Sequence, residues 1–248
     1  MKKGLSYFIS DEIFQRFPGY VRGVVVAENV QNRPSPNELI GLMREVELSL
    51  RNRLDLGKIA EHPRIKSWRD AYRAFGARPG EFRSSIEALT RRILRGDGLP
   101  SINALVDIGN VVSLRHLIPA GGHAIDMLEE DIALRFAAGE EEFIPFGSDQ
   151  IEHPLPGEVI FAEGNAVLTR RWTWRQANHT LTVLETEAIE FNLDALPPVP
   201  QEEIEETCQE VIDLMSLYCG GQARYELLTE RNPKMRLSVE KSDQDFQN

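Results

Sequence analysis

The helical hydrophobic pattern of this 248-residue chain ends near Pro119, and short strand-like segments follow it. Before that point, apolar side chains recur at the three- and four-residue spacing of amphipathic helices. After it, short apolar runs are separated by glycine, proline and asparagine, which is typical of strands and turns. Helices followed by strands, without regular alternation, favour an α+β fold over a doubly wound parallel sheet.

The hydrophobic pattern predicts individual strands and helices along the chain. Residues 20–30 are rich in β-branched side chains and predict a buried strand. Helices are expected over residues 36–54, 63–75, 84–95 and 102–117. After them we expect strands over residues 132–136, 159–162, 167–173 and 180–185. A long final helix is expected over residues 202–228, with Gly220 and Gly221 as the place where it can break. The later strands predict a β-sandwich-like core between residues 131 and 191, with the helices packed around it.

The chain is expected to form one compact body, because no linker rich in proline, glycine and serine divides it. In this organisation residues 1–60 add a strand and a helix to the body. Residues 61–232 form its main domain, including the long final helix, and residues 233–248 are a polar tail. With 42% hydrophobic and 27% charged residues, the composition excludes a disordered chain.

The cysteine spacing and the hydropathy exclude two further classes of protein. Cys208 and Cys219 lie eleven residues apart within the expected final helix, which separates them by roughly 16 Å and excludes a disulfide between them. No apolar run approaches the length of a membrane span, and the first residues lack the sustained apolar stretch of a signal peptide. We therefore expect a cytoplasmic protein without a membrane partner.

Charge is distributed unevenly along the chain. The net charge of −11 argues against a non-specific nucleic-acid coat protein. Residues 64–95, however, contain nine basic side chains and only three acidic ones. This basic segment is either a face for an anionic ligand or a set of helix faces that meet acidic partners within the fold.

Most common catalytic motifs are absent from the sequence. It has no phosphate loop, no complete dinucleotide fingerprint, no G-x-S-x-G elbow and no zinc motif. His116, His123 and Asp126 lack a specific metal-ligand spacing. We therefore predict no metal and no cofactor.

The segment around residues 103–126 carries the most informative polar residues. Asn103, Asp107 and Asn110 interrupt an apolar helical run, although such side chains compete for backbone hydrogen bonds and disfavour helix interiors. They either satisfy one another and nearby loops or mark a site. His123 follows two glycines, and Asp126 is placed three residues later, where it can orient the imidazole.

An ordered set of residues extends from this segment into the second half of the chain. The set is Val106, Asp107, Asn110, Val112, Pro119, residues 123–126, residues 156–159, the strand 167–172 and residues 186–189. In these residues the chain resembles the B3/B4 domain of the phenylalanyl-tRNA synthetase beta subunit, over residues 65–215. The resemblance implies a freestanding protein with a B3/B4-like fold. It also implies that domain's activity, which is hydrolysis of tRNA misacylated with tyrosine.

The same resemblance implies where the site lies. Asn110 and His123 fall at family positions near the scissile ester, although His123 lies two residues further along than in the synthetase pattern. The family glutamate that recognises the tyrosine hydroxyl corresponds to Asn192, and Glu190 would point to the same side of a strand. Arginines near residues 169–171 replace a small Ala-Gly pair of the family and would reshape the pocket.

An aminoacyl ester is an activated bond, so positioning alone can suffice for its hydrolysis. The resemblance gives His123 the role of polarising a water or the terminal ribose, and Asn110 the role of holding the substrate. Trp172 and Trp174 alternate on an expected strand and either stack on substrate or pack the sheet. The remaining predicted substrate-binding residues are Asp126, Arg170, Arg171, Glu190 and Asn192, and the predicted RNA-binding residues are Arg91 and Arg92.

The leading hypothesis is a hydrolase that deacylates mischarged tRNA in trans. The alternative is a non-catalytic module of the same fold that binds tRNA or a free amino acid. A third hypothesis is a metal-independent hydrolase of small esters or amides. Release of amino acid from mischarged tRNA, faster than spontaneous decay, separates the first hypothesis from the second.

Overall fold

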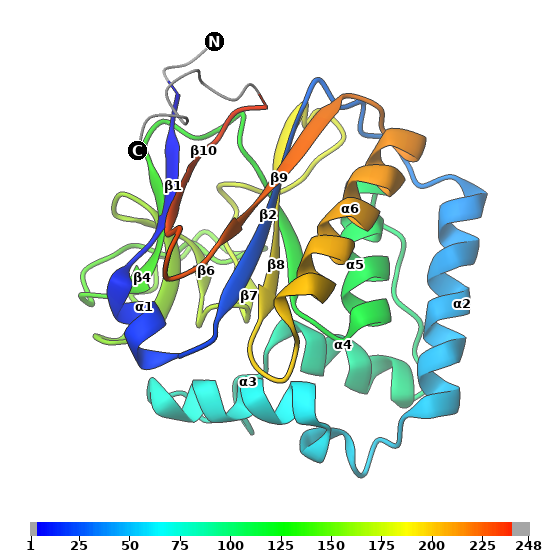
Figure 1. The fold of residues 1–248 in the computed structure, drawn as a ribbon, viewed down its shortest axis with the longest axis horizontal. Coiled ribbons are helices and arrows are strands. Elements are labelled where there is room, and N and C mark those ends of the chain that lie inside the picture. The colour runs from blue at the N-terminus through cyan, green and yellow to red at the C-terminus, as the bar shows by residue number, and fades with distance from the viewer. Residues whose placement is uncertain (1–3, 240–248) are drawn as a thin grey trace.

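The computed structural model describes residues 4–239, in which two β-sheets and six α-helices form an α+β fold (Figure 1). The helices are α1 (Asp11–Arg16), α2 (Asn37–Arg53), α3 (Pro63–Ala74), α4 (Ser85–Leu94), α5 (Ala104–His116) and α6 (Gln201–Tyr218). The strands are β1 (Ser6–Ile9), β2 (Val21–Glu28), β3 (Ala120–Ala124), β4 (Ile132–Phe136), β5 (Val159–Glu163), β6 (Ala166–Arg170), β7 (Arg175–Gln176), β8 (Ala188–Ala195), β9 (Gln222–Leu228) and β10 (Lys234–Arg236).

The two sheets face each other as a sandwich. The larger has the order β10-β1-β4-β5-β6-β7, with only β1 and β4 parallel, and the smaller has the antiparallel order β3-β8-β2-β9. The ring of Phe161 on β5 packs 5.1 Å from that of His123 on β3, across the gap between the sheets. The expected α+β class with a sandwich-like core is confirmed, but the sandwich is wider than residues 131–191, since β1, β2, β3, β9 and β10 also belong to it.

Strand β2 forms the centre of the smaller sheet, as its β-branched sequence predicts. It pairs with β8 on one side and β9 on the other, and six of its eight residues are buried. Gly23 allows this strand to lie close to α6, because a Cβ there would be 2.4 Å from the Sγ of Cys208. Residues 1–60 thus supply strands to both sheets.

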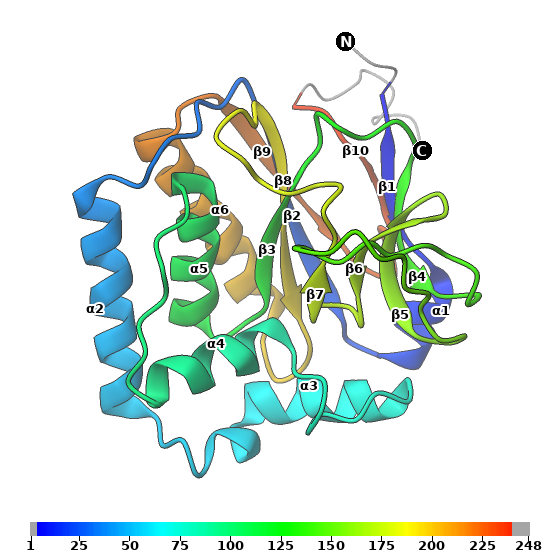
Figure 2. The same ribbon diagram turned by 180° about the vertical axis from the view of Figure 1, so that it is seen from behind.

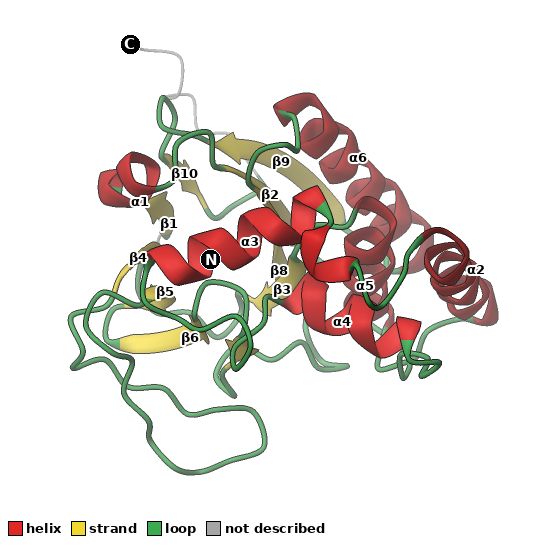
Figure 3. Ribbon diagram, turned by 90° about the horizontal axis from the view of Figure 1, so that it is seen from below, coloured by secondary structure: helices red, strands yellow, loops and turns green. Residues whose placement is uncertain are grey.

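Helices cover the outer face of the smaller sheet. Helix α6 packs on β2, β8 and β9, while α5 packs against α6, α2 and β3 (Figures 1 and 2). Helices α3 and α4 cross the end of the molecule, and the loop-rich side lies beyond β6 (Figure 3). No helix within residues 4–239 is long and apolar enough to cross a membrane.

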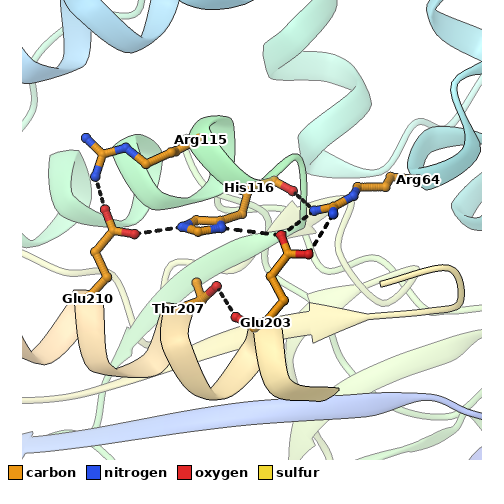
Figure 4. Close-up of polar contacts among 6 residues, drawn as sticks. All are labelled: Arg64, Arg115, His116, Glu203, Thr207 and Glu210. Carbon is orange, nitrogen blue, oxygen red and sulfur yellow. Dashed lines mark hydrogen bonds and ion pairs between the residues drawn. The ribbon is translucent and has the colours of Figure 1, made fainter. Parts of the chain in front are cut away.

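A polar network joins the end of α5 to α6 (Figure 4). His116 lies between Glu203, at 3.4 Å, and Glu210, at 2.7 Å. Both terminal nitrogens of Arg64 donate to the Glu203 carboxylate at 2.6 Å, and Arg115 donates to Glu210. The hydrogen bonds and charge of Arg64 lower the pKa of Glu203. The first arginine of the basic segment therefore meets an acidic partner within the fold.

The C-terminal part differs from the prediction of one long helix over residues 202–228. Helix α6 ends at Tyr218, because Gly220 and Gly221 adopt left-handed φ angles of 64° and 86° and reverse the chain into β9. Part of the expected polar tail is also a strand, since β10 pairs with β1. Residues 240–248 of that tail lie outside the described residues.

Two strand predictions in the second half need correction. Residues 180–185 form a loop rather than a strand. Strand β6 ends at Arg170 because Arg171 and Trp172 have positive φ angles of 49° and 65°. Strands β1, β3 and β7 and helix α1 were not expected from the sequence, and β8 was expected only as the strand that carries Glu190 and Asn192. Cys208 and Cys219 are free, as their spacing predicts.

Candidate functional site

A cavity of about 910 Å³ opens between the two sheets and helices α4 and α5. Its volume lies within the range of about 300–1,000 Å³ that is typical of small-molecule sites. The polar side chains that line it are Arg22, Asn110, His123, Thr169, Gln176 and Asn192, among others. Exposed apolar side chains also line it, namely Ile102, Phe146, Val183 and Leu184. The cavity thus combines an apolar mouth with convergent polar groups.

His123 lies on β3 and points into the gap between the sheets. Its Nδ1 lies 2.6 Å from the hydroxyl of Thr180 and 3.3 Å from the amide nitrogen of Gln176, and its Nε2 lies 3.2 Å from the hydroxyl of Thr169. The amide nitrogen of Gln176 can only donate, which favours the tautomer with the proton on Nε2. Three side chains therefore fix the imidazole.

The imidazole is neutral at ordinary pH. Burial, together with the smaller effect of the positive charge of Arg22, lowers the pKa of His123 to about 3. Only 6% of the residue is exposed. A neutral imidazole here can donate from one ring nitrogen and accept at the other, which suits it to orient a water or a hydroxyl.

Glu190 and Asn192 lie on β8 opposite β3 and share the inward face with His123. The register places Glu190 directly across from His123, and Asn192 follows two residues later on the same face. The Nδ2 of Asn192 donates to Glu190 at 2.9 Å, and the hydroxyl of Tyr7 donates to the Oδ1 of Asn192 at 2.8 Å. Asn192 lines the cavity, and Glu190 lies behind it, fully buried.

Glu190 is held in its protonated form at neutral pH. Burial raises the pKa of Glu190 to about 8, although Arg22 and the hydrogen bond from Asn192 oppose this shift. Its Oε2 has no hydrogen-bond partner among the described residues. A neutral carboxyl can occupy such a site, whereas an ionised one would lack compensation.

Arg22 is the charged group at the inner end of the cavity. Its Nε donates to Asp194 at 2.7 Å, and a terminal nitrogen donates to the hydroxyl of Tyr7. Burial opposes its charge, but Asp194 together with Tyr20 and Tyr7 outweighs burial and raises the pKa of Arg22. The guanidinium therefore stays charged although the residue is only 1% exposed.

Asn110 lines the cavity from α5. Its two polar neighbours in sequence are structural: Asn103 caps α5 by accepting from the backbone nitrogen of Val106 at 3.0 Å, and Asp107 accepts from the hydroxyl of Ser35 at 2.6 Å. The Asn110 amide has no hydrogen-bond partner within residues 4–239. Asn110 is thus free to bind a ligand, and it shares one cavity with His123.

Comparison with known proteins identifies the family. The B3/4 domain family matches residues 67–220, which is more than half of the chain. The chain belongs to the B3/4 domain family. No curated protein sequence matches this B3/4 chain. One similar solved structure is an N-terminal fragment of the phenylalanyl-tRNA synthetase beta subunit from Pyrococcus horikoshii, with a TM-score of 0.46 and 10% identity. That match covers 90% of this chain and 51% of the fragment, so the chain spans about half of its length.

Asp126 of this B3/4 domain does not contact the His123 imidazole. Its carboxylate is exposed and accepts from the backbone nitrogen of Glu187 at 3.1 Å, just before β8. Thr169, Gln176 and Thr180 hold the imidazole instead, so Asp126 acts on the segment that follows His123 and not on its ring.

The two strand-end arginines point away from the B3/4 cavity. Arg170 donates to both carboxylate oxygens of Glu158, at 2.8 and 3.0 Å, and to Glu152 at 2.8 Å. Arg171 stacks on the ring of Phe82, at 3.7 Å from its centroid, and lies 3.4 Å from Glu158. Neither arginine lines the cavity, and both lie within ion-pair distance of Glu158, so their assignment to substrate binding stays a prediction.

The two tryptophans differ in their surroundings. Trp172 is 2% exposed and packs edge-on against Trp68 and Tyr20, with centroids 5.0 and 4.8 Å away, so it chiefly fills the core although it also reaches the cavity wall. Trp174 is half-buried, packs on Phe82 and lines the cavity. Because β6 ends before them, they do not alternate on one strand.

Arg91 and Arg92 lie on α4, outside the main cavity. The Nε of Arg91 donates to the buried carboxylate of Glu87 at 2.8 Å, and the exposed Arg92 donates to the backbone oxygen of Gly98 at 3.1 Å.

Among the described residues, no group of three or more His, Cys, Asp or Glu side chains is placed to hold a metal ion.

Several polar groups of the site are not predicted by the sequence. Thr169, Gln176 and Thr180 carry no pattern that distinguishes them from other polar residues of strands and loops. Arg22 does carry a signal, because it is the one basic residue in the β-branched run of residues 20–30. A charge within a buried strand requires a partner, and this one finds Asp194 across the sheet.

Proposed function

We propose that this chain is a hydrolase that deacylates misacylated tRNA in trans, with tRNA as its partner. The observation that carries the proposal is that Asn110, which lacks a protein partner, and the neutral His123 line one cavity of suitable size. The family resemblance assigns the same two residues to the ester. An activated ester needs a positioned water and a polarised carbonyl rather than a catalytic triad.

Each residue has a separate role in this proposal. The Nε2 of His123 has the longer contact with the protein, 3.2 Å to Thr169, and exchanges it for a water or the ribose hydroxyl. Asn110 holds the carbonyl or the amine of the aminoacyl group through its free amide. Asn192, backed by Glu190, contacts the amino-acid side chain at the inner end. Because this position carries Asn192 rather than a glutamate, the preferred amino acid need not be tyrosine.

The test is release of amino acid from a panel of tRNAs, each charged with a different wrong amino acid. We expect the purified protein to accelerate release from at least one of them, and Asn110→Ala to reduce that rate. Asn37→Ala, which alters an exposed asparagine on α2, is the matched control and keeps the rate. Release at the spontaneous rate from every tRNA would refute the proposal.

One observation favours a second candidate function, a non-catalytic module that binds tRNA or a free amino acid. Both ring nitrogens of His123 already contact protein side chains, so the imidazole can serve the fold alone. Under this alternative the same tRNA panel is bound without release. Small amino-acid esters in a parallel assay test for the third activity, hydrolysis of low-molecular-weight esters.

A further inference from the structure

A second, smaller cavity of about 260 Å³ lies beside the candidate site, and its wall is basic. It is lined by Arg83, Arg91 and Arg95, together with Glu81, Ala88 and Trp174. Ala88 and Trp174 also line the larger cavity. The two cavities therefore share a wall, with the indole ring of Trp174 between them.

The geometry of α4 explains why guanidinium groups gather here. Ala88, Arg91 and Arg95 follow one another at spacings of three and four residues, which places them along one face of the helix. Arg83 joins them from the turn before the helix. A single helix face thus runs from the wall of the larger cavity into the basic one.

Positive charge in the smaller cavity exceeds the negative charge that faces it. The Oε1 of Glu87 accepts from Arg69 at 2.7 Å and from Arg91 at 2.8 Å, and it lies 3.9 Å from the Nε of Arg83. That Nε is buried and has no hydrogen-bond partner among the described residues. One carboxylate is therefore shared by three arginines.

The other charges around the cavity do not restore the balance. Arg95 is exposed and forms no ion pair within the described part of the chain. Glu81 lines the cavity, but its carboxylate pairs with Arg78 at 3.0 Å. An anion in this cavity would satisfy donors of Arg83 and Arg95 that the protein leaves free.

We infer that the smaller cavity is a phosphate subsite, which binds the phosphate of a nucleotide whose nucleoside lies in the larger cavity against Trp174. Guanidinium groups match the paired oxygens of a phosphate, and an indole ring is a stacking partner for a base. Arg171 lies 4.5 Å and Arg175 5.9 Å from the centroid of the Trp174 ring, so the base would contact the part of the ring that lines the larger cavity. The inference deepens the proposed function and rests on it for one point, that the nucleotide is the 3′-terminal nucleotide of an RNA. The assignment of a phosphate beside a nucleoside depends only on the two adjoining cavities.

The test compares the affinities of three probes for the full chain by isothermal titration calorimetry: adenosine 5′-monophosphate, adenosine and inorganic phosphate. We expect the nucleotide to bind at least about tenfold more tightly than either part alone, because hydrogen bonds to a charged group contribute about a factor of ten or more each. Equal affinity for the nucleotide and adenosine, or for the nucleotide and phosphate, would overturn the inference.

The decisive variant is the double substitution Arg83→Gln and Arg95→Gln. It should weaken binding of the nucleotide by about tenfold or more and leave binding of adenosine unchanged. The matched control is Arg53→Gln with Arg236→Gln, which removes the same charge from exposed arginines on α2 and β10 that line neither cavity. An equal loss in both double variants would show a general charge effect and overturn the inference.

This experiment can fail independently of the proposed function, because it measures no hydrolysis. Binding of the nucleotide through Arg83 and Arg95, without release of amino acid from any tRNA, would keep the subsite and refute the deacylase. Deacylation together with unchanged nucleotide binding in the Arg83→Gln, Arg95→Gln variant would do the reverse. Equal thermal unfolding midpoints of the two double variants exclude misfolding as the cause.

Discussion

Replacement of Glu190 by glutamine should remove a pH dependence from the stability of the fold. Burial raises the pKa of this carboxyl to about 8, from an ordinary value of 4.5, and the residue is fully buried. Below pH 4.5 the carboxyl is protonated in both the folded and the unfolded chain. Between pH 4.5 and 8 the unfolded chain releases the proton and the folded chain keeps it, so the free energy of unfolding falls as pH rises.

The size of this effect follows from the shift. A difference of about 3.5 pKa units corresponds to about 5 kcal/mol, at about 1.4 kcal/mol per unit. Glutamine keeps the shape of the side chain but does not titrate. The stability of the wild type relative to Glu190→Gln should therefore fall by about 5 kcal/mol between pH 4.5 and 8.5, and then level off.

Urea unfolding monitored by tryptophan fluorescence at a series of pH values measures this difference. Glu140→Gln, which changes an exposed glutamate, is the control and should give a curve parallel to that of the wild type. Parallel curves for Glu190→Gln as well would refute the reasoning. They would show that Glu190 is ionised in the fold and compensated by Arg22.

Three other predictions concern the site and the packing. His123→Ala should slow deacylation about tenfold or more. Because His123 is buried on a strand and hydrogen-bonded, the same substitution should reduce the free energy of unfolding, measured in urea, by about 2 kcal/mol. Gly23→Ala should reduce the free energy of unfolding by about 1–3 kcal/mol, because the new Cβ would lie 2.4 Å from the Sγ of Cys208. Gly41→Ala, inside α2 with open space around it, should leave the free energy of unfolding unchanged or raise it. Arg92→Glu should weaken tRNA binding in a filter-binding series. The slope of the logarithm of the binding constant against the logarithm of the salt concentration should also become shallower by about one unit. An unchanged slope would place the RNA contact elsewhere.

Elements with strong local periodicity were predictable because their own side chains define a buried face. Strand β2 and helices α2, α3 and α5 fall where the sequence places them. Strand β3 escaped prediction because its two glycines carry no side-chain pattern. Gly122 is needed there, since a Cβ would lie 2.7 Å from the Cδ1 of Ile189 on the paired strand. Strand β9 was taken as helix because its pairing with β2 depends on a distant segment.

Some residues of the candidate site were likewise predictable from the sequence, and others were not. The family resemblance singles out Asn110 and His123 in the sequence, and strand alternation places Glu190 and Asn192 on one face. The partners of His123 and the ion pairs of Arg170 depend on segments that the sequence does not connect. Thr180, for example, lies 57 residues from His123 along the chain.

The sequence by itself determined the α+β class, the membership of the B3/4 family and the two polar positions that define the candidate site. Only the tertiary structure decided which charges are free to meet a ligand. Arg170 is paired with Glu158, whereas Arg83 lies 3.9 Å from a carboxylate that Arg69 and Arg91 already bind, and Arg95 forms no ion pair within the described residues. Both arginines border the smaller cavity beside Trp174. The physical reason is that a pattern reports which face of an element is buried, whereas pairing and desolvation depend on what other elements bring against that face.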